Sequence, residues 1–464
     1  MGAGAPVSKG GRRCRPPPPL LGSAERGVAR HVTGRERRRL GERLVSTRSA
    51  AGTTPRRPSG EPESPYAWLR LAAAVCLGTV GGVGMWSVVV VLPAVQAEFG
   101  VARAGASLPY TCVTLGLVGG GVLMGRLSDR FGVAVPAVIG SFALGLGYVL
   151  AARMESLWAF SLVYGVLIGL LGTAAVFGPL VADTSLWFGR RRGIAVALCA
   201  SGNYFAGAFW PPVVQHFIET VGWRQTHTGI GLFCLATMLP LTFAMRRPPP
   251  AERGAPGSVG GTGGAAWPAL GLSPNALQAL LTLAGVSCCV AMAMPQVHIV
   301  AYCVDLGYGA ARGAEMLSLM LACGVASRLA FGLVMDRLGG LATLLLGSML
   351  QAAALALFLP FDGLASLYAV SAIFGLFQGG IVPSYAMIVR EFFPAREAGT
   401  RVGIALSSTL AGMALGGWMS GAIFDATGSY QAAVLNGLLW NGLNMAVAAW
   451  LLLRARRRPR VALA

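Results

Sequence analysis

A single arginine, Arg328, lies in the middle of a long apolar stretch of the sequence and could bind an anion there. A guanidinium presents a planar fork of N–H donors that matches the two oxygens of a carboxylate. If the stretch crosses a membrane, inserting this charge costs about 2.5–3.5 kcal/mol, and such residues are usually functional. No acidic residue lies in the interior of the apolar stretches, and Asp183 at the end of one comes nearest, so an anionic ligand is the natural counter-ion. The alternative is an arginine whose donors bond to backbone carbonyls and water.

Another apolar stretch carries three polar side chains, Gln296, His298 and Tyr302, shortly after Pro295. In a helix, His298 and Tyr302 are four residues apart and share one face. An imidazole can donate a hydrogen bond to a carboxylate or carry a proton near neutral pH. We therefore expect all three to bind substrate and His298 to be the leading candidate for proton coupling. The alternative for His298 is a neutral side chain bonded to a neighbouring helix.

Five more polar or aromatic residues of the apolar stretches are predicted to line the same substrate site. Amides and hydroxyls can orient a small ligand, and packing between helices is the alternative for each of them. Gly379, Gly380 and Pro383 also predict a weakened helix beside two of the five, Gln378 and Tyr385. The five residues are Asn203, Tyr204, Gln378, Tyr385 and Tyr110.

Motifs for enzymatic chemistry are absent from the sequence. There is no H-E-x-x-H, G-x-S-x-G or Walker A pattern, and the nine cysteines show no C-x-x-C spacing. Eight of the nine lie in apolar stretches, where cysteine behaves as a small hydrophobic residue. We expect a protein that is not an enzyme and holds no metal or cofactor.

The stretches that carry these residues are long enough to cross a membrane. Of the 464 residues, 55% are hydrophobic and only 12% are charged, whereas soluble domains have about 25% charged residues. Apolar runs of about 20 residues alternate with short polar breaks, and a helix of that length spans the roughly 30 Å of a bilayer's hydrocarbon core. We therefore predict an all-α polytopic membrane protein with twelve transmembrane helices. Their approximate ranges are 69–95, 106–125, 133–152, 157–183, 193–214, 226–245, 274–304, 314–334, 341–360, 364–388, 399–421 and 432–453.

The net charge of +19 indicates membrane topology rather than nucleic-acid binding. Residues 1–65 contain 14 basic and 5 acidic residues in a Pro-, Gly- and Arg-rich sequence that is typical of disorder. Beyond Arg70, 17 arginines fall in the loops and tail of one side and only four on the other. The positive-inside rule then places both termini in the cytoplasm and the helices in an inner or plasma membrane. Residues 1–65 are expected either to form a cytoplasmic tail or to result from a start codon assigned too early, and we favour the second interpretation.

An eight-residue segment occurs twice and divides the chain into two similar halves. Residues 125–132 and 332–339 align without gaps and share Gly, Asp, Arg and Gly. Each copy follows the second helix of a six-helix set, which predicts two pseudo-symmetric bundles. The predicted order after residues 1–65 is a bundle at 66–245, a linker at 246–271, a bundle at 272–453 and a basic tail at 454–464.

The repeated segment is predicted to act as a conformational latch. Its glycines permit a tight turn between helices, and its Asp–Arg pair can bind helix ends and opposite charges. Asp183 is predicted to lie at the same face and to belong to the latch, with a proton carrier as the alternative. The latch residues are Gly125, Asp129, Arg130, Gly132, Asp183, Asp336 and Arg337.

The first copy, G-R-L-S-D-R-F-G, is similar to the loop signature of the major facilitator superfamily. With twelve predicted spans and a central linker, the chain resembles that superfamily over residues 69–453. The resemblance implies two six-helix bundles that rock about a central site and expose it to each side of the membrane in turn.

Two segments are similar to a narrower group, the monocarboxylate transporters. Residues 187–202, W-F-G-R-R-R-G-I-A-V-A-L-C-A-S-G, resemble the pattern Y-F-x-K-R-R-x-L-A-x-G-x-A-x-A-G. Residues 328–334 resemble the eighth-helix segment whose arginine holds the substrate carboxylate, and the related oxalate:formate antiporters also use a membrane arginine there. The family's acid one turn earlier, implicated in proton coupling, is Gly324 here, and its first-helix motif is replaced by residues 77–82. The resemblance implies an anion-binding Arg328 and leaves proton coupling open.

We therefore predict a secondary active transporter of a small organic anion, above all a monocarboxylate, that works by alternating access in the lipid bilayer. A drug or metabolite efflux pump is a weaker alternative because such sites need buried acids. A non-transporting membrane sensor would call for a signalling domain, and none is visible. The G-x-x-x-G spacings Gly412/Gly416 and Gly417/Gly421 are predicted to pack helices within one chain, so a monomer is expected.

Overall fold

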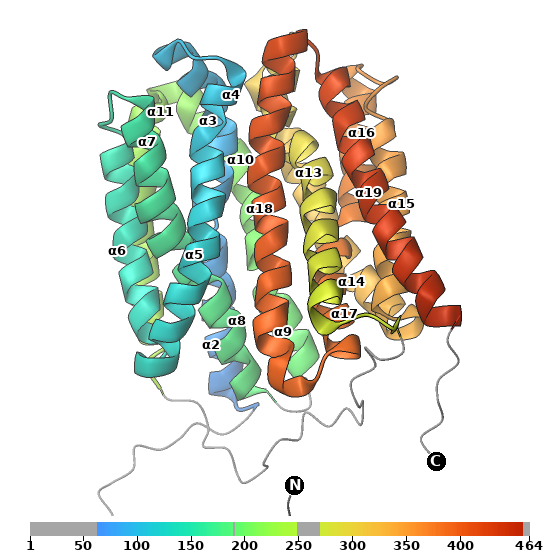
Figure 1. Ribbon diagram of the computed structural model, residues 1–464. Helices are drawn as coiled ribbons and strands as arrows, with labels where there is room; N and C mark the ends of the chain where they lie inside the picture. The colour runs from blue at the N-terminus through green and yellow to red at the C-terminus, as the bar shows by residue number, and fades with distance from the viewer. Residues whose placement is uncertain (1–62, 189–190, 248–269, 458–464) are drawn as a thin grey trace, which may run out of the picture. The chain divides into compact units, whose positions relative to one another are not determined.

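The computed structural model describes residues 63–188, 191–247 and 270–457, and the regular secondary structure of these residues is helical (Figure 1). They lie in one compact unit, Ser59–Ala464. We call residues 65–243 the N-half and residues 274–457 the C-half. The N-half contains α2 (Pro65–Gly81), α3 (Val83–Phe99), α4 (Arg103–Ala106), α5 (Leu108–Phe131), α6 (Ala134–Ala151), α7 (Leu157–Val163), η1 (Tyr164–Gly172), η2 (Thr173–Val176), α8 (Gly178–Trp187), α9 (Arg192–Ala200), α10 (Gly202–Val221) and α11 (Trp223–Phe243). The C-half contains α13 (Pro274–Asp305), α14 (Ala310–Leu338), α15 (Gly340–Ala356), α16 (Leu364–Gln378), α17 (Ile381–Phe392), α18 (Ala395–Thr427) and α19 (Tyr430–Arg457).

Eleven helical segments of the described residues are long and apolar enough to cross a membrane. At the ninth predicted span the apolar helix α15 is shorter, with 17 residues, so the predicted count of twelve is confirmed only in part. The last helix continues to Arg457, and the predicted tail at 454–464 therefore begins inside a helix. Residues 1–62 of the predicted tail, 248–269 of the linker and 458–464 lie outside the described residues.

Each half begins with the same pair of residues, a serine followed by a proline. Ser64 and Ser273 each accept a hydrogen bond from the amide three residues later, and proline occupies the first helical position. Serine satisfies a free amide at a helix start, and proline has no amide to satisfy there. The spans that follow are the most enclosed, with 78% of the apolar segment of Pro65–Phe99 and 72% of that of Pro274–Asp305 buried. The first span of each half is therefore an inner helix of the bundle.

Four spans are interrupted part-way along their length. The first breaks at Gly82 between α2 and α3, the fifth at Ser201 between α9 and α10, and the tenth at Gly379 and Gly380 between α16 and α17. The fourth passes through the π-helix η1 and the short 3-10 helix η2. A break frees backbone groups that a continuous helix would pair, and these need other partners inside a membrane. The break at Gly379 and Gly380 is the one that the sequence predicts.

The repeated loop segment ends in a sharp turn in both halves. Gly132 follows α5 with a φ of +82°, and Gly339 follows α14 with a φ of +79°. Residues with a side chain rarely adopt such backbone, whereas glycine does so readily. Gly132 and Gly339 thus form the tight turns, whereas Gly125 and Gly332 lie inside the preceding helices.

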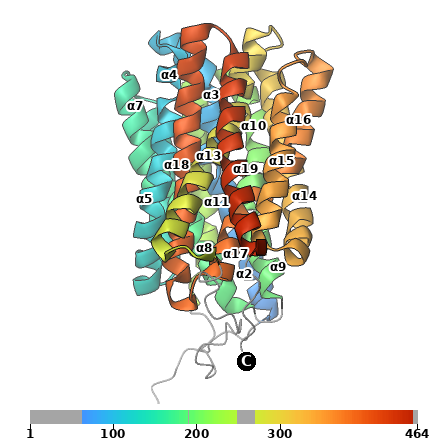
Figure 2. The same ribbon diagram turned by 45° about the vertical axis from the view of Figure 1, so that its right-hand side comes forward.

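The two halves meet where α10 packs on α14 and along α18, which lies between α13 of its own half and α5 of the N-half (Figure 1, Figure 2). Gly412 and Gly416 bring α18 into backbone contact with α13. Gly417 and Gly421 face the N-half, where a Cβ added at Gly421 would lie 2.9 Å from the amide nitrogen of Ala104. The glycine spacings therefore pack helices within one chain, and Gly421 allows the halves to touch.

Candidate functional site

Arg328 lies on α14, half-buried at the junction of the two halves. Its Nη1 donates to the carbonyl of Ala200 at 3.2 Å, and its guanidinium lies over the ring of Tyr204, 4.0 Å from the ring centre. Its Nε is enclosed and has no hydrogen-bond partner within the described part of the chain. The ion pairs found there do not include Arg328. The guanidinium is thus bound to a carbonyl and an aromatic face, without an acid.

The carbonyl that Arg328 binds is made available by the break between α9 and α10. In a continuous α-helix the amide of Tyr204 would donate to Ala200, four residues earlier. Here that amide donates to Ser201 at 2.9 Å, as in a tighter turn. The Ala200 carbonyl is left for a side chain, and Arg328 reaches it from the other half.

Gly324, one turn before Arg328 on α14, gives the Tyr204 ring its space. A Cβ added at Gly324 would lie 2.5 Å from Cε1 of Tyr204. Such a distance is far below ordinary contact, so a side chain at position 324 requires the ring to move. The position at which the resembling family carries an acid is therefore covered by the ring of Tyr204.

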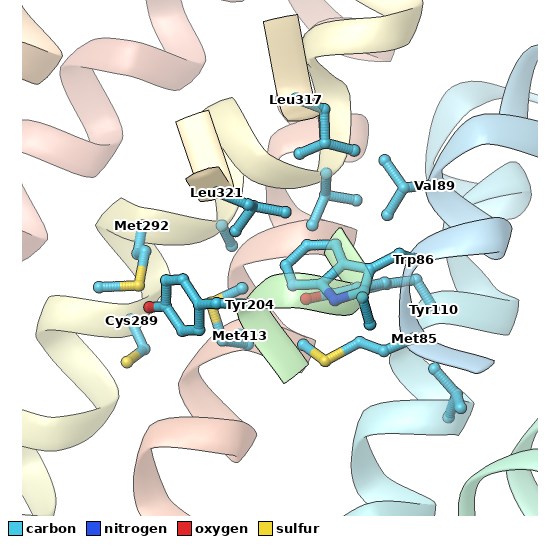
Figure 3. Packing of buried hydrophobic residues seen from close by; sticks show 14 of the residues in the cluster. Met85, Trp86, Val89, Tyr110, Tyr204, Cys289, Met292, Leu317, Leu321 and Met413 are labelled. Atoms are coloured by element: carbon cyan, nitrogen blue, oxygen red, sulfur yellow. The ribbon is translucent and has the colours of Figure 1, made fainter. Parts of the chain in front are cut away.

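Apolar side chains from both halves surround this junction. Figure 3 shows Trp86 and Met85 of α3 and Leu321 of α14 beside Tyr204, whose ring points toward Met292 of α13. All of them are buried. Nothing in the sequence marks these residues as part of a site, because a methionine or leucine in an apolar stretch is ordinary there. A ligand bound to Arg328 would have an apolar surface beside it.

The structure brings Gln296 and Gln378 together within the C-half. The Nε2 of Gln296 donates to Oε1 of Gln378 at 2.5 Å, and Nε2 of Gln378 is buried without a partner among the described residues. The next residue, Gly379, packs on α14, where a Cβ added to it would lie 2.6 Å from the carbonyl oxygen of Gly324. The pair therefore adjoins the segment of α14 that carries Arg328.

Tyr110 and Asn203 also lie at the interface of the halves. Tyr110 is buried against Gly417 of α18, and its hydroxyl has no partner among the described residues. Asn203 is half-buried; its side chain makes only a weak contact of 3.9 Å with the sulfur of Met85. Both side chains keep hydrogen-bonding capacity that a ligand could use.

Tyr385 lies elsewhere, in a hydrogen-bonded network of the C-half. Its hydroxyl donates to Asn444 at 3.0 Å, and the amide of Asn444 donates to Ser348 at 2.7 Å. These residues join α17, α19 and α15. The structure thus assigns Tyr385 to packing between helices and does not bring it to Arg328.

His298 and Tyr302 share a face of α13, as their spacing predicts, but that face meets Tyr430 of α19. The ring of Tyr430 lies 5.5 Å from that of His298 and 5.3 Å from that of Tyr302. His298 is buried, with Nε2 2.7 Å from the carbonyl oxygen of Gly417 and Nδ1 3.1 Å from the hydroxyl of Tyr430. Since a carbonyl only accepts, Nε2 carries a proton. His298 is therefore bonded to neighbouring helices, which is the alternative given above for this residue, and not to Arg328.

Tyr430 connects His298 to an arginine that the sequence analysis counted only as a loop charge. Nη2 of Arg103 lies 2.9 Å from Oδ1 of Asp305, and Nη1 donates to the Tyr430 hydroxyl at 3.2 Å. The main-chain amides of Arg103 and Ala104 each donate at 2.8 Å to the carboxylate of Asp425. We call this group, Arg103 with Asp305, Asp425 and Tyr430, the Arg103 clamp, and its end of the bundle the Arg103 end. It ties the N-half to the C-half.

Asp183 pairs with Arg70 instead of with the repeated loop. Nε and Nη2 of Arg70 donate to the two carboxylate oxygens at 2.8 and 2.9 Å, and the side chains are 3% and 9% exposed. Arg70 also donates to the carbonyl of Ala244 and lies over the ring of Trp187. The pair joins the first, fourth and sixth spans of the N-half at the end where α2 begins, which we call the α2 end.

The four charged residues of the repeated loops are exposed at the α2 end. Asp129, Arg130, Asp336 and Arg337 all lie at the surface, and the ion pairs of the described residues do not include them. Gly125 is half-buried in the last turns of α5. In this conformation the repeated loops therefore form no charged link between the halves.

A family model described as Major Facilitator Superfamily matches residues 74–365 and 305–463 of the chain. The chain belongs to the major facilitator superfamily. This superfamily member is 28% identical to monocarboxylate transporter 11 of Mus musculus over 394 residues, which cover 82% of the chain and 86% of that protein. It is 25% identical to the MFS-type transporter pynF of Aspergillus niger over 309 residues, which cover 66% and 69%.

A solved structure shares the fold at low sequence identity. A bacterial homologue of the human lysosomal transporter Spinster, in an inward-facing and unoccupied conformation, matches with a TM-score of 0.63 and 14% identity, covering 85% of this chain and 98% of that one. With the family match, this likeness confirms the predicted fold class. The family match and the monocarboxylate transporter relatives together confirm the resemblance to the monocarboxylate transporter branch. The protein is a multi-pass membrane protein of a transporter family.

Proposed function

We propose that this superfamily member carries a small organic anion, a monocarboxylate, across the membrane and binds its carboxylate at Arg328. The observation that carries the proposal is the incomplete bonding of the guanidinium, which has one carbonyl acceptor, an aromatic face and an enclosed Nε without a partner in the described residues. A buried donor left unpaired costs about 1–3 kcal/mol, more when charged. A carboxylate accepts from two guanidinium nitrogens and removes both the charge and the unpaired donor.

The surroundings of Arg328 favour a carboxylate that carries an apolar body. Leu321 lies two turns before it on α14, and Met85, Trp86 and Met292 are buried beside Tyr204. Such side chains solvate hydrocarbon rather than a second charge. The monocarboxylate transporters among the relatives support the same class of substrate.

Transport by alternating access is the mechanism that we infer. The Arg103 clamp holds the halves together at one end, while the four charged residues of the repeated loops are exposed at the other. The arginine distribution predicts that the α2 end faces the cytoplasm. A conformation that exposes the Arg328 site at the Arg103 end would require the clamp to break.

Uptake into proteoliposomes tests the proposal. Labelled lactate, pyruvate, and branched or aromatic carboxylates are offered to wild type and to Arg328→Ala, with and without a pH gradient. The matched control is Arg312→Ala, at the other end of the same helix, whose exposed ion pair with Glu315 makes no contact with Arg328. We expect uptake to fall to background in Arg328→Ala and to persist in Arg312→Ala. Undiminished carboxylate uptake by Arg328→Ala would overturn the proposal, and transport of cationic drugs alone would favour the efflux alternative.

A further inference from the structure

An open groove on the C-half lies over α13, between α18 and α19. Both views of the molecule show α13 between these two helices (Figure 1, Figure 2). The groove has a volume of about 600 Å³ and is lined by residues of all three helices. It is separate from the substrate site proposed above, because its lining includes neither Arg328 nor the groups that bind Arg328.

The charged and amide side chains of the groove gather at its α2 end. Arg401 of α18 donates to Oδ1 of Asn275 at 3.4 Å and to the carbonyl of Pro274 at 3.5 Å, where α13 begins. Its Nε and Nη2 also lie 3.0 Å from the carboxylate of Glu397. The two contacts with α13 are long for hydrogen bonds, so the oxygens of a phosphate can replace them.

One turn deeper in the groove, Gln278 has hydrogen-bonding capacity that the protein does not use. The residue is 7% exposed, and its Nε2 reaches the carbonyl of Arg401 only at 3.4 Å. Its Oε1 has no partner among the described residues. Buried polar groups are normally paired, so this amide marks a position for a ligand. Because it is weakly held, the amide can turn and donate to an ester carbonyl of a lipid.

Toward the middle of the bundle the groove is apolar. Leu283 and Val286 continue its floor along α13, and Ile404 of α18 and Trp440 of α19 complete the lining. Leu283 and Ile404 are exposed there. From residue 275 to residue 286 the groove follows α13 for about 16 Å, at 1.5 Å per residue. This length matches one leaflet, whose share of the hydrocarbon core is about 15 Å.

We propose that this groove binds one anionic phospholipid, with the phosphate at Arg401 and an acyl chain along α13 toward Trp440. The guanidinium and the amide of Asn275 supply donors to the phosphate oxygens. The arginine distribution predicts that the α2 end faces the cytoplasm, and the cytoplasmic leaflet is the one that carries anionic lipids. The last turns of α19 add Arg454 and Arg456 at this end. Because α13, α18 and α19 all belong to the C-half, the lipid can stay bound however the two halves are arranged.

Photo-crosslinking tests the site in the full chain, reconstituted in nanodiscs of phosphatidylcholine. The probe is a trace of phosphatidylglycerol or of phosphatidylcholine with a diazirine near the end of one acyl chain, and mass spectrometry identifies the labelled peptides. A hydrogen bond to a charged group predicts that phosphatidylglycerol labels the peptides of Val286 and Trp440 about tenfold more than phosphatidylcholine does. Equal labelling by the two lipids, or no labelling of these peptides, would overturn the proposal.

An apolar groove between α10 and α11 serves as the internal control. Phe209, Phe217 and Phe233 contribute to its lining, and none of the described residues that line it is charged. Both lipids should label it equally, because it offers nothing that distinguishes their headgroups. The same preference for phosphatidylglycerol in both grooves would show that Arg401 is not its cause.

Variants separate the headgroup from the chain. Arg401→Gln removes the charge and should bring the labelling ratio close to one, whereas Arg312→Gln, whose exposed pair with Glu315 lies at the other end of the bundle, should keep it. Glu397→Gln removes the competing carboxylate and should raise the ratio. Thr282→Trp leaves Arg401 in place and fills the groove, so labelling by both lipids should be lost. With labelling measured on folded, monodisperse protein, a wild-type ratio in Arg401→Gln or full labelling of Thr282→Trp would refute the site.

Discussion

Replacing Arg103 with alanine removes the side chain that joins the two halves at the Arg103 end. The substitution deletes the 2.9 Å ion pair with Asp305, the 3.2 Å hydrogen bond to Tyr430 and the stacking of the guanidinium on Phe424. It keeps the two bonds to the carboxylate of Asp425, because their donors are main-chain amides. The clamp is therefore weakened and not abolished.

The size of the effect follows from the burial of the pair. A hydrogen bond to a charged group contributes about 1.5–3 kcal/mol. The side chain of Arg103 is 8% exposed and that of Asp305 is 30% exposed, so water screens the pair in part and the lower end of this range applies. The stacking on Phe424 adds about 0.5–1 kcal/mol. A total of about 2 kcal/mol shifts the ratio of closed to open Arg103 ends by roughly 30-fold.

Distances between spin labels measure this ratio. Cysteines introduced at Glu155 and Asp362 place one label on each half in exposed loops of the Arg103 end. In lipid nanodiscs, the short distance of the wild type should give way to a longer one in Arg103→Ala. Arg312→Ala is the matched control, since its exposed pair with Glu315 lies within the C-half at the same end. An unchanged distance distribution in folded Arg103→Ala would refute the assignment of the clamp.

Three further substitutions separate stability from transport. Asp183→Asn removes the negative charge that pairs with the buried Arg70, which should destabilise the protein by about 3–5 kcal/mol. A melting temperature equal to that of the wild type would contradict this expectation. Tyr385→Phe removes the hydrogen bond to Asn444 and should cost about 1 kcal/mol in stability while the KM for substrate stays constant, so a raised KM would return Tyr385 to the substrate site. Gly421→Val should push the halves apart at the Arg103 end, because even a Cβ would lie 2.9 Å from the main chain of the N-half; the labels described above should then report the longer distance.

The sequence was sufficient to find Arg328 because the signal is local, a single charge in a long apolar stretch. Its acceptor could not be predicted in the same way. The Ala200 carbonyl becomes available only because the helix tightens at Ser201, and it reaches Arg328 only because the two halves pack at this depth. In the sequence Gly324 stands out only because an acid is missing there, whereas its effect, the space for the Tyr204 ring, depends on a neighbour 120 residues away along the chain.

The Arg103 clamp illustrates the same limit at the end of the bundle. Arg103 lies just after a turn between two spans, and a positive charge in such a loop indicates only the topology of the chain in the membrane. Its partners Asp305 and Asp425 are 202 and 322 residues away, and no local pattern links them. Helical spacing correctly predicts that His298 and Tyr302 share one face, but it does not say which helix that face meets. Periodicity thus predicts the face of a residue, and tertiary packing decides its partner.

The arrangement of charge pairs differs between the two ends of the bundle. At the Arg103 end a basic residue of the N-half bonds to acids of the C-half, so opening that end breaks the pair Arg103–Asp305. At the α2 end the pair Arg70–Asp183 lies within the N-half and the pair Arg401–Glu397 within the C-half, so separating the halves there breaks neither. A conformation in which the Arg103 end is open must therefore gain contacts at the α2 end to offset the loss of the clamp. The exposed charges of the repeated loops are placed to supply these contacts. Arg130→Ala should consequently increase the population of the conformation described here. The spin-label distances should then show a narrower distribution at the short distance.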